Sequence, residues 1–151
     1  MLITQNIIDA LKNQGVIVDS AQTILVKKLS QLKLDKKFSF TIRNFLRKRS
    51  LGIYIWGEVG RGKTLIVREY LNQLKKKDIK SFHYIDFMNF IHNELNENSG
   101  LSDPLKQVSE SIIKRYSLIF IDEFQVEDVA DAMIVGSLLI KILESGTKII
   151  L

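Results

Sequence analysis

Residues 51–71, LGIYIWGEVGRGKTLIVREYL, contain an apolar run, a glycine-rich loop and the start of a helical pattern in direct succession. The run LGIYIW at 51–56 has the length and composition of a buried strand, and residues 64–77 carry helical spacing. Between them, residues 57–64 match the pattern G-x-x-x-x-G-K-[ST], and Gly60 adds a position that tolerates positive φ. This order predicts a phosphate-binding loop, or P-loop; an ordinary glycine turn is the alternative.

The predicted loop gives each of its polar groups a role. A helix N-terminus offers unpaired N–H groups and the positive end of the helix dipole, and both favour a bound phosphate. We expect Lys63 to reach the β- and γ-phosphates of ATP and the Thr64 hydroxyl to ligate Mg²⁺. The expected nucleotide-binding residues are Gly57, Glu58, Val59, Gly60, Arg61, Gly62, Lys63 and Thr64.

A second apolar run, SLIFIDEF at 117–124, ends in an acidic pair. A magnesium ion held by a P-loop needs a carboxylate partner, and the carboxyl end of a neighbouring strand would supply one. We expect Asp122 to serve the metal and Glu123 to polarise the attacking water, which makes Lys63 and Glu123 the candidate catalytic residues. A solvated acidic pair at a strand end is the alternative for this stretch alone. The chain has no N-K-x-D stretch, which favours an ATPase over a GTPase.

From residue 51 onward, apolar runs alternate with helical stretches, and this alternation predicts an α/β core with a mostly parallel sheet and helical crossovers. The first 50 residues carry helical spacing and are expected to form a small basic helical segment, 1–50, before a P-loop ATPase core, 51–151. The expected strands are 51–56, 81–85, 117–121 and 147–151. The expected helices are 2–12, 20–34, 64–77, 86–96, 105–116 and 128–144.

Composition limits the class of protein. The chain has 151 residues and 46% hydrophobic content, which fits a compact globular protein. It has no apolar run of about eighteen residues, so no transmembrane helix is expected. Residues 1–14 contain one lysine and no arginine, unlike a signal or transit peptide, and we expect a cytoplasmic protein. The absence of cysteine excludes disulfides, thiol catalysis and cysteine-ligated zinc.

The net charge of +5 is unevenly distributed, since residues 1–50 hold ten basic and three acidic residues. The excess lies in KLDKKFSFTIRNFLRKRS at 33–50, where basic residues are interleaved with phenylalanines. This pattern is compatible with nucleic acid or an acidic partner. Without a base-stacking motif, a solvated helix face is the favoured alternative. The basic residues concerned are Lys36, Lys37, Arg43, Arg47, Lys48 and Arg49.

Other candidate residues have simpler explanations. His83 and His92 lack a third metal ligand nearby, so packing or surface positions are expected for both. Trp56, directly before the loop, is expected to lie in the core rather than to stack on adenine. Asp86 is expected to follow the second strand, where it either caps a helix or touches the site.

The stretch FIDEFQVEDVADAMI at 120–134 is more specific than an acidic pair requires. It resembles the signature of the ZapE family of AFG-type P-loop ATPases, which are AAA+-like ATPases of bacterial cell division with mitochondrial relatives. The resemblance also covers GEVGRGKT, HYIDFMNFIHNEL, DPLKQVSESI and, more faintly, GVIVDSAQ with Gly15, Asp19 and Gln22. It implies an ATPase that forms a homo-oligomer around nucleotide and associates with a protein of the division machinery. Gln125, Asp128 and Asp131 either orient the following helix or contact a neighbouring subunit.

The resemblance also implies segments beyond Leu151. In this family the strand after the acidic pair leads into a Thr-Ser-Asn sensor, an arginine finger and further helices. We therefore expect an incomplete core in which the last strand lies between the P-loop strand and the acidic strand. Two alternatives to an active ATPase remain open: a non-catalytic remnant or split-gene half that acts as a nucleotide-dependent interaction module, and a helicase-loader-like ATPase that binds single-stranded DNA.

Overall fold

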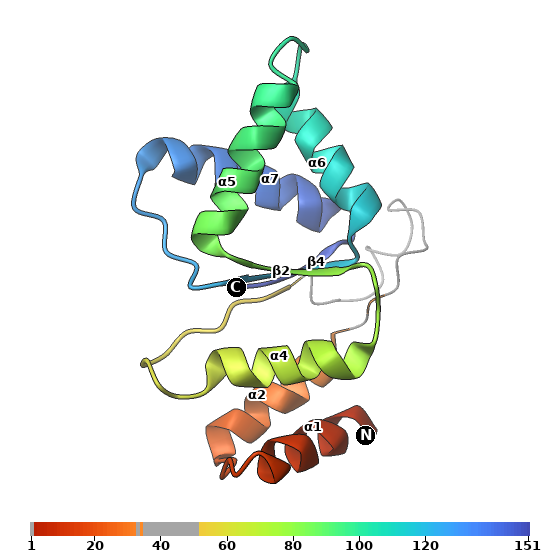
Figure 1. The fold of residues 1–151 in the computed structure, drawn as a ribbon, viewed down its shortest axis with the longest axis vertical. Coiled ribbons are helices and arrows are strands. Elements are labelled where there is room, and N and C mark those ends of the chain that lie inside the picture. Colours follow the sequence, from red (N-terminus) through yellow and green to blue (C-terminus); the bar gives the residue numbers. More distant parts are fainter. Residues whose placement is uncertain (1, 33, 35–51) are drawn as a thin grey trace. The chain divides into compact units, whose positions relative to one another are not determined.

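The computed structural model describes residues 2–32, 34 and 52–151 (Figure 1). The chain forms two compact units. The helical unit comprises Met1–Lys33 and Tyr54–Lys77, and the sheet unit comprises Leu34–Ile53 and Asp78–Leu151. The division at residue 50, expected from composition, stays a prediction, and the basic stretch at 35–50 lies outside the described residues.

Three helices pack against one another in the helical unit: α1 (Leu2–Asn13), α2 (Ser20–Ser30) and α4 (Lys63–Leu74). The helical spacing predicted all three, although α2 ends at Ser30 rather than at residue 34. Their apolar faces supply the buried side chains of this unit, which is the usual source of stability for short helices. These side chains include Ile7, Leu11, Val26, Leu29, Leu32, Ile66, Val67 and Tyr70.

Among the described residues, four parallel strands form the sheet: β1 (Gly52–Ile53), β2 (Ile79–His83), β3 (Leu118–Asp122) and β4 (Lys148–Ile150). Their order is β1-β4-β3-β2, which confirms that the last strand lies between the P-loop strand and the acidic strand. Every residue of β3 is buried, as its uninterrupted apolar run predicts. Within the described part of the chain, β1 pairs with β4 alone and lies at an edge.

Three helices of the sheet unit lie on the same side of the sheet: α5 (Tyr84–Glu97), α6 (Pro104–Arg115) and α7 (Val129–Glu144) (Figure 1). Alternate strand residues point toward them, because successive side chains of a strand face opposite sides of a sheet. Ile119, Ile121 and Ile149 therefore join the helices in one apolar core. The helix residues of this core are Tyr84, Phe87, Met88, Ile91, Val108, Ile112, Val135, Leu138 and Ile142.

The boundary between β2 and α5 differs from the prediction. The expected strand 81–85 begins earlier, at Ile79, and Tyr84 and Ile85 already belong to α5. β2 pairs residue by residue with β3, so it ends where His83 lies opposite Asp122. Beyond this point Tyr84 packs edge-to-face on Phe124, at 5.3 Å between ring centroids, which a helical turn allows. Asp86 consequently lies in the first turn of α5.

Two expectations near the loop are wrong. The expected strand 51–56 pairs only through Gly52–Ile53 in the described residues. Trp56 is not a core residue, since 82% of its surface is exposed. Both follow from one cause: after Ile53 the chain leaves the sheet for the loop, so Tyr54 and Trp56 face solvent despite their apolar character.

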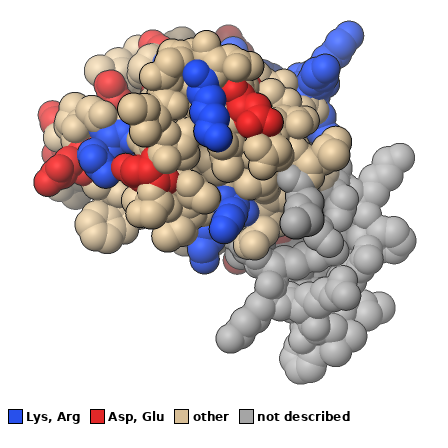
Figure 2. All heavy atoms as spheres, turned by 90° about the horizontal axis from the view of Figure 1, so that it is seen from below, with Lys and Arg blue, Asp and Glu red and all other residues tan. Residues whose placement is uncertain are grey.

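Charged side chains of both signs share the surface. On the face drawn in Figure 2, acidic side chains lie beside basic ones, without a single large basic area among the coloured residues. Mixed surface charge of this kind is usual for solvated helices and does not by itself indicate a nucleic-acid interface.

Candidate nucleotide site

The predicted P-loop is an open turn that leads directly into α4. Gly57, Gly60 and Gly62 have φ values of 144°, 83° and 72°, a region that residues with a Cβ rarely adopt. Gly62 is the N-cap of α4, so the loop ends at a helix N-terminus. A Cβ built on Gly57 or Gly60 would meet no other atom within 4 Å, so the space beside these residues is open. The loop therefore offers room and backbone donors for an anion.

Lys63 closes this loop on itself. Its Nζ donates hydrogen bonds to the carbonyl oxygens of Gly57, at 2.8 Å, and Glu58, at 2.7 Å. The ammonium group is therefore held at the mouth of the loop by two partners that phosphate oxygens could replace. An ammonium group in this position suits a ligand with several negative charges.

The start of α2 holds the other side of the loop. Arg61 donates to Asp19 Oδ2 at 2.8 Å, and the Gln22 amide donates to the Arg61 carbonyl at 3.0 Å. Asp19 and Gln22 are themselves fixed by a capping box, in which each side chain accepts from the other's backbone N–H. We call Asp19, Gln22 and Arg61 the loop tether. Sequence reasoning missed its role, although the D-x-x-Q capping pattern and the resemblance at GVIVDSAQ both marked the first two residues.

The acidic pair lies at the carboxyl end of β3, as predicted. Asp122 is buried and Glu123 is exposed, so one carboxylate is held within the fold and the next reaches solvent. Glu123 has a φ of 54°, in the left-handed region, and its N–H donates to Asp122 Oδ1 at 3.2 Å. A non-glycine residue held in this region costs about 1 kcal/mol or more and is often found at functional sites.

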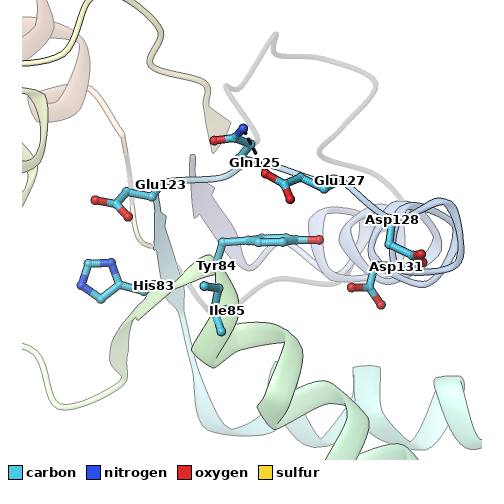
Figure 3. Close-up of a pocket in the computed structure, with 8 residues that line it drawn as sticks. All are labelled: His83, Tyr84, Ile85, Glu123, Gln125, Glu127, Asp128 and Asp131. Atoms are coloured by element: carbon cyan, nitrogen blue, oxygen red, sulfur yellow. Dashed lines mark hydrogen bonds between the residues drawn. The ribbon is translucent and has the colours of Figure 1, made fainter.

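The stretch after Glu123 surrounds a pocket on the sheet unit (Figure 3). Asp128 caps α7 by accepting from the N–H groups of Ala130 and Asp131. Asp131 Oδ1 lies 3.0 Å from His92 Nε2, at hydrogen-bonding distance, so His92 has a surface partner on α7. Burial, followed by the nearby charges of Asp131 and Asp128, raises the pKa of Tyr84.

Each unit carries groups suited to part of a metal–nucleotide complex. In the helical unit, the loop is open and rich in donors, as a triphosphate requires, and it ends at the hydroxyl of Thr64. In the sheet unit, Asp122 carries a carboxylate, and hydroxyl and carboxylate oxygens are hard ligands of the kind that Mg²⁺ prefers. In the described residues, no group of three or more acidic or histidine side chains is placed to hold a metal.

The parallel order β1-β4-β3-β2, together with a glycine loop that leads from β1 into a helix, defines an α/β fold of the P-loop NTPase class. The family model described as AFG1-like ATPase matches residues 1–151. The chain therefore belongs to the AFG1-like ATPase family.

Curated relatives agree with this assignment. The cell division protein ZapE of Escherichia coli is 32% identical over 99 residues, which cover 66% of this chain and 26% of that protein. Lactation elevated protein 1 homolog B of Danio rerio is 30% identical over 110 residues, 66% of this chain and 22% of that protein. The chain thus spans about a quarter of the length of the curated relatives it matches.

No solved structure was found to match the chain. Among the helices that the structure describes, none combines the length and the apolar character needed to cross a membrane.

Proposed function

We propose that this chain provides the ATP-binding part of an ATPase that converts ATP to ADP and phosphate with Mg²⁺. The observation that carries the proposal is the loop at 57–64, which leads into the N-terminus of α4 and whose Lys63, the first residue of that helix, donates to two loop carbonyls. Such a loop directs backbone N–H groups and one ammonium group toward a common point, which suits triphosphate oxygens. The family description, an ATPase, supports the same function.

Each polar group has a role in this proposal. Lys63 exchanges its carbonyl partners for the β- and γ-phosphate oxygens. Thr64 and Asp122 would hold Mg²⁺, which would neutralise charge on the phosphates. Glu123 accepts a proton from the water that attacks the γ-phosphorus. The bond between that phosphorus and the β–γ bridging oxygen breaks, and ADP leaves with the bridging oxygen.

The topology supports assigning the loop and the acidic pair to one reaction. β1, β4 and β3 are parallel neighbours, so their carboxyl ends meet at one edge of the sheet. The chain leaves this edge at Ile53 and enters the loop at Gly57, four residues later. Asp122 is the last residue of β3 at the same edge.

The partners of the whole protein follow from the resemblance. The Escherichia coli relative is named a cell division protein. We propose that the whole protein acts as a homo-oligomer together with a protein of the division machinery. Co-purification of the native protein with division proteins, and its mass under native conditions, would test both parts.

Binding of ATP to the 151-residue chain tests the central proposal. Lys63→Ala removes the ammonium group, and we expect ATP affinity in an equilibrium titration with a fluorescent analogue to fall about tenfold or more. Lys77→Ala, which removes a lysine that lies outside the loop, should leave it unchanged. Equal affinities of the unaltered chain and the Lys63→Ala variant would rule out the loop as the phosphate site.

A further inference from the structure

The pocket beside the acidic pair measures about 390 Å³ and lies at the carboxyl ends of β2 and β3 (Figure 3). Glu123 is the one lining residue with a role in the proposed hydrolysis. The others come from the β2–α5 junction and from the segment that enters α7. The lining residues are His83, Tyr84, Ile85, Glu123, Gln125, Glu127, Asp128 and Asp131.

The negative charge of the residues that line the pocket favours a bound cation. Four carboxylates surround the pocket. Asp128 uses its Oδ1 to cap α7, and Asp131 uses its Oδ1 to pair with His92. Their Oδ2 atoms make no hydrogen bond within the described part of the chain, so they remain able to accept from a ligand. Carboxylates that line one pocket favour a positively charged ligand.

Tyr84 supplies an independent sign of a missing partner. Its side chain is nearly covered, with 9% of the residue surface exposed, and its buried hydroxyl has no hydrogen-bond partner among the described residues. Figure 3 shows this hydroxyl pointing toward Asp128 and Asp131. A buried polar group without a partner costs about 1–3 kcal/mol. A ligand whose N–H groups reach both the hydroxyl and the carboxylates would remove that cost.

The walls of the pocket select among cations. A bare metal ion does not suit it, since no group of three or more acidic or histidine side chains in the described residues is arranged for one. The ring of Tyr84 and the aliphatic chain of Ile85 instead offer apolar walls. Arginine combines an aliphatic stem with a planar, weakly hydrated guanidinium that has five N–H donors. Lysine matches the charge but cannot donate to several acceptors in one plane.

An exposed apolar side chain on the pocket wall points to a polypeptide rather than a free metabolite. Ile85 lines the pocket and is exposed. Apolar contacts beside an arginine-binding pocket are typical of protein–protein interfaces. We propose that the pocket binds an arginine side chain of a separate partner protein, whose neighbouring residues pack on Ile85.

A peptide probe tests this proposal on the 151-residue chain without nucleotide, so its outcome is separate from that of ATP binding. The probe is acetyl-Gly-Arg-Gly-amide, and its control carries neutral citrulline in place of arginine. In ¹H–¹⁵N spectra we expect the arginine peptide to shift the amides of Tyr84 and Asp131. The citrulline peptide should bind about tenfold more weakly, because a charge-assisted hydrogen bond contributes about 1.5–3 kcal/mol.

Variants locate the binding. Asp131→Asn should weaken arginine-peptide binding about tenfold, whereas Glu144→Gln, an equal charge change at the far end of α7, should not. Tyr84→Phe removes only the hydroxyl and should weaken binding several-fold. Circular dichroism shows whether each variant is folded. If Asp131→Asn is not folded, Tyr84→Phe alone tests where the peptide binds.

Three results would overturn the proposal. Equal binding of the arginine and citrulline peptides would show that binding does not require a positive charge. A lysine peptide that binds as tightly as the arginine peptide would show that binding does not require a guanidinium group. If neither Asp131→Asn nor Tyr84→Phe affected binding, the arginine peptide would bind outside this pocket. Self-association of the chain that the arginine peptide competes away would make the occupant a second copy rather than a separate partner.

Discussion

Glu123 combines an exposed carboxylate with a backbone conformation that few glutamates adopt, at a φ of 54°. The conformation turns the chain sharply after the buried strand β3, so that consecutive acids point in different directions. The strain is tolerated because β3 on one side and the capped start of α7 on the other fix the segment. A carboxylate that stays at a defined place without a ligand suits the role of base that we propose for Glu123, because it needs little reorganisation when water is bound.

Replacing this carboxylate separates binding from hydrolysis. Glu123→Gln keeps the size and backbone of the side chain but removes its basicity. We expect ATP affinity to stay within about twofold and the hydrolysis rate of the turnover-competent assembly to fall by about 10²-fold or more. A single-turnover assay measures the rate. An unchanged rate would exclude Glu123 as the base.

At the scale of elements, the start of α2 matters because it performs two tasks. Asp19 caps the helix and also pairs with Arg61 in the P-loop. The cap of α6 is a matched case, since Asp103 accepts from the Lys106 N–H and its side chain pairs with Lys141 of α7.

The two caps can therefore be compared directly. Asp19→Ala and Asp103→Ala should each lower the free energy of unfolding by about 1 kcal/mol, as loss of a helix cap does. Only Asp19→Ala should also weaken ATP binding, because it frees Arg61 and loosens the loop. Thermal unfolding and ATP titration of both variants measure the two effects. An equal loss of ATP affinity in both variants would show that general destabilisation, and not the loop tether, is responsible.

Whether a segment forms a helix or a strand was predictable where its apolar pattern extends over many residues. The start of a helix was predictable to within one residue where a capping residue precedes it. The helices expected at 105–116 and 128–144 begin at Pro104 and Val129, one residue from the expected starts, and each follows an aspartate cap, Asp103 and Asp128. The end of β2 was predicted too late because HYI at 83–85, taken without its tertiary contacts, has the composition of a strand. Its boundary is set by pairing with β3 and by packing of Tyr84 on Phe124, both of which join residues distant in sequence.

At the scale of the whole molecule, the parallel sheet and its strand order were predictable, since the alternation of strands and helices leaves few topologies open. The loop tether and the pocket beside Tyr84 were not. The tether joins Asp19 to Arg61, which are 42 residues apart in the sequence. The pocket depends on the position of the Tyr84 side chain in the folded chain. Such features arise from tertiary packing and leave no periodic trace in the sequence.

Burial of a tyrosine makes the stability of the folded chain depend on pH at alkaline values. Burial raises the pKa of Tyr70 to about 12, and its hydroxyl lies 3.5 Å from the Leu32 carbonyl. Above about pH 10 the unfolded chain loses this proton while the folded chain keeps it, so unfolding becomes easier by roughly 1.4 kcal/mol per pH unit until the folded pKa is reached.

Denaturant unfolding between pH 9 and pH 12 checks this expectation. Tyr70→Phe removes the titrating group, and the stability of this variant should fall less steeply with pH than that of the unaltered chain over that range. Tyr54→Phe, which alters an exposed tyrosine of the helical unit, is the control and should keep the steeper slope. Identical slopes for the unaltered chain and Tyr70→Phe would contradict the assigned pKa.

The exposed position of Trp56 turns the single tryptophan of this chain into an optical reporter. Its indole is already in water and adjoins Gly57 in sequence, so its emission responds to what happens at the P-loop rather than to melting of the core. Quenching or a blue shift on adding nucleotide would follow loop occupancy without any attached dye. For the same reason tryptophan fluorescence is a poor gauge of unfolding here, and backbone circular dichroism is the better choice.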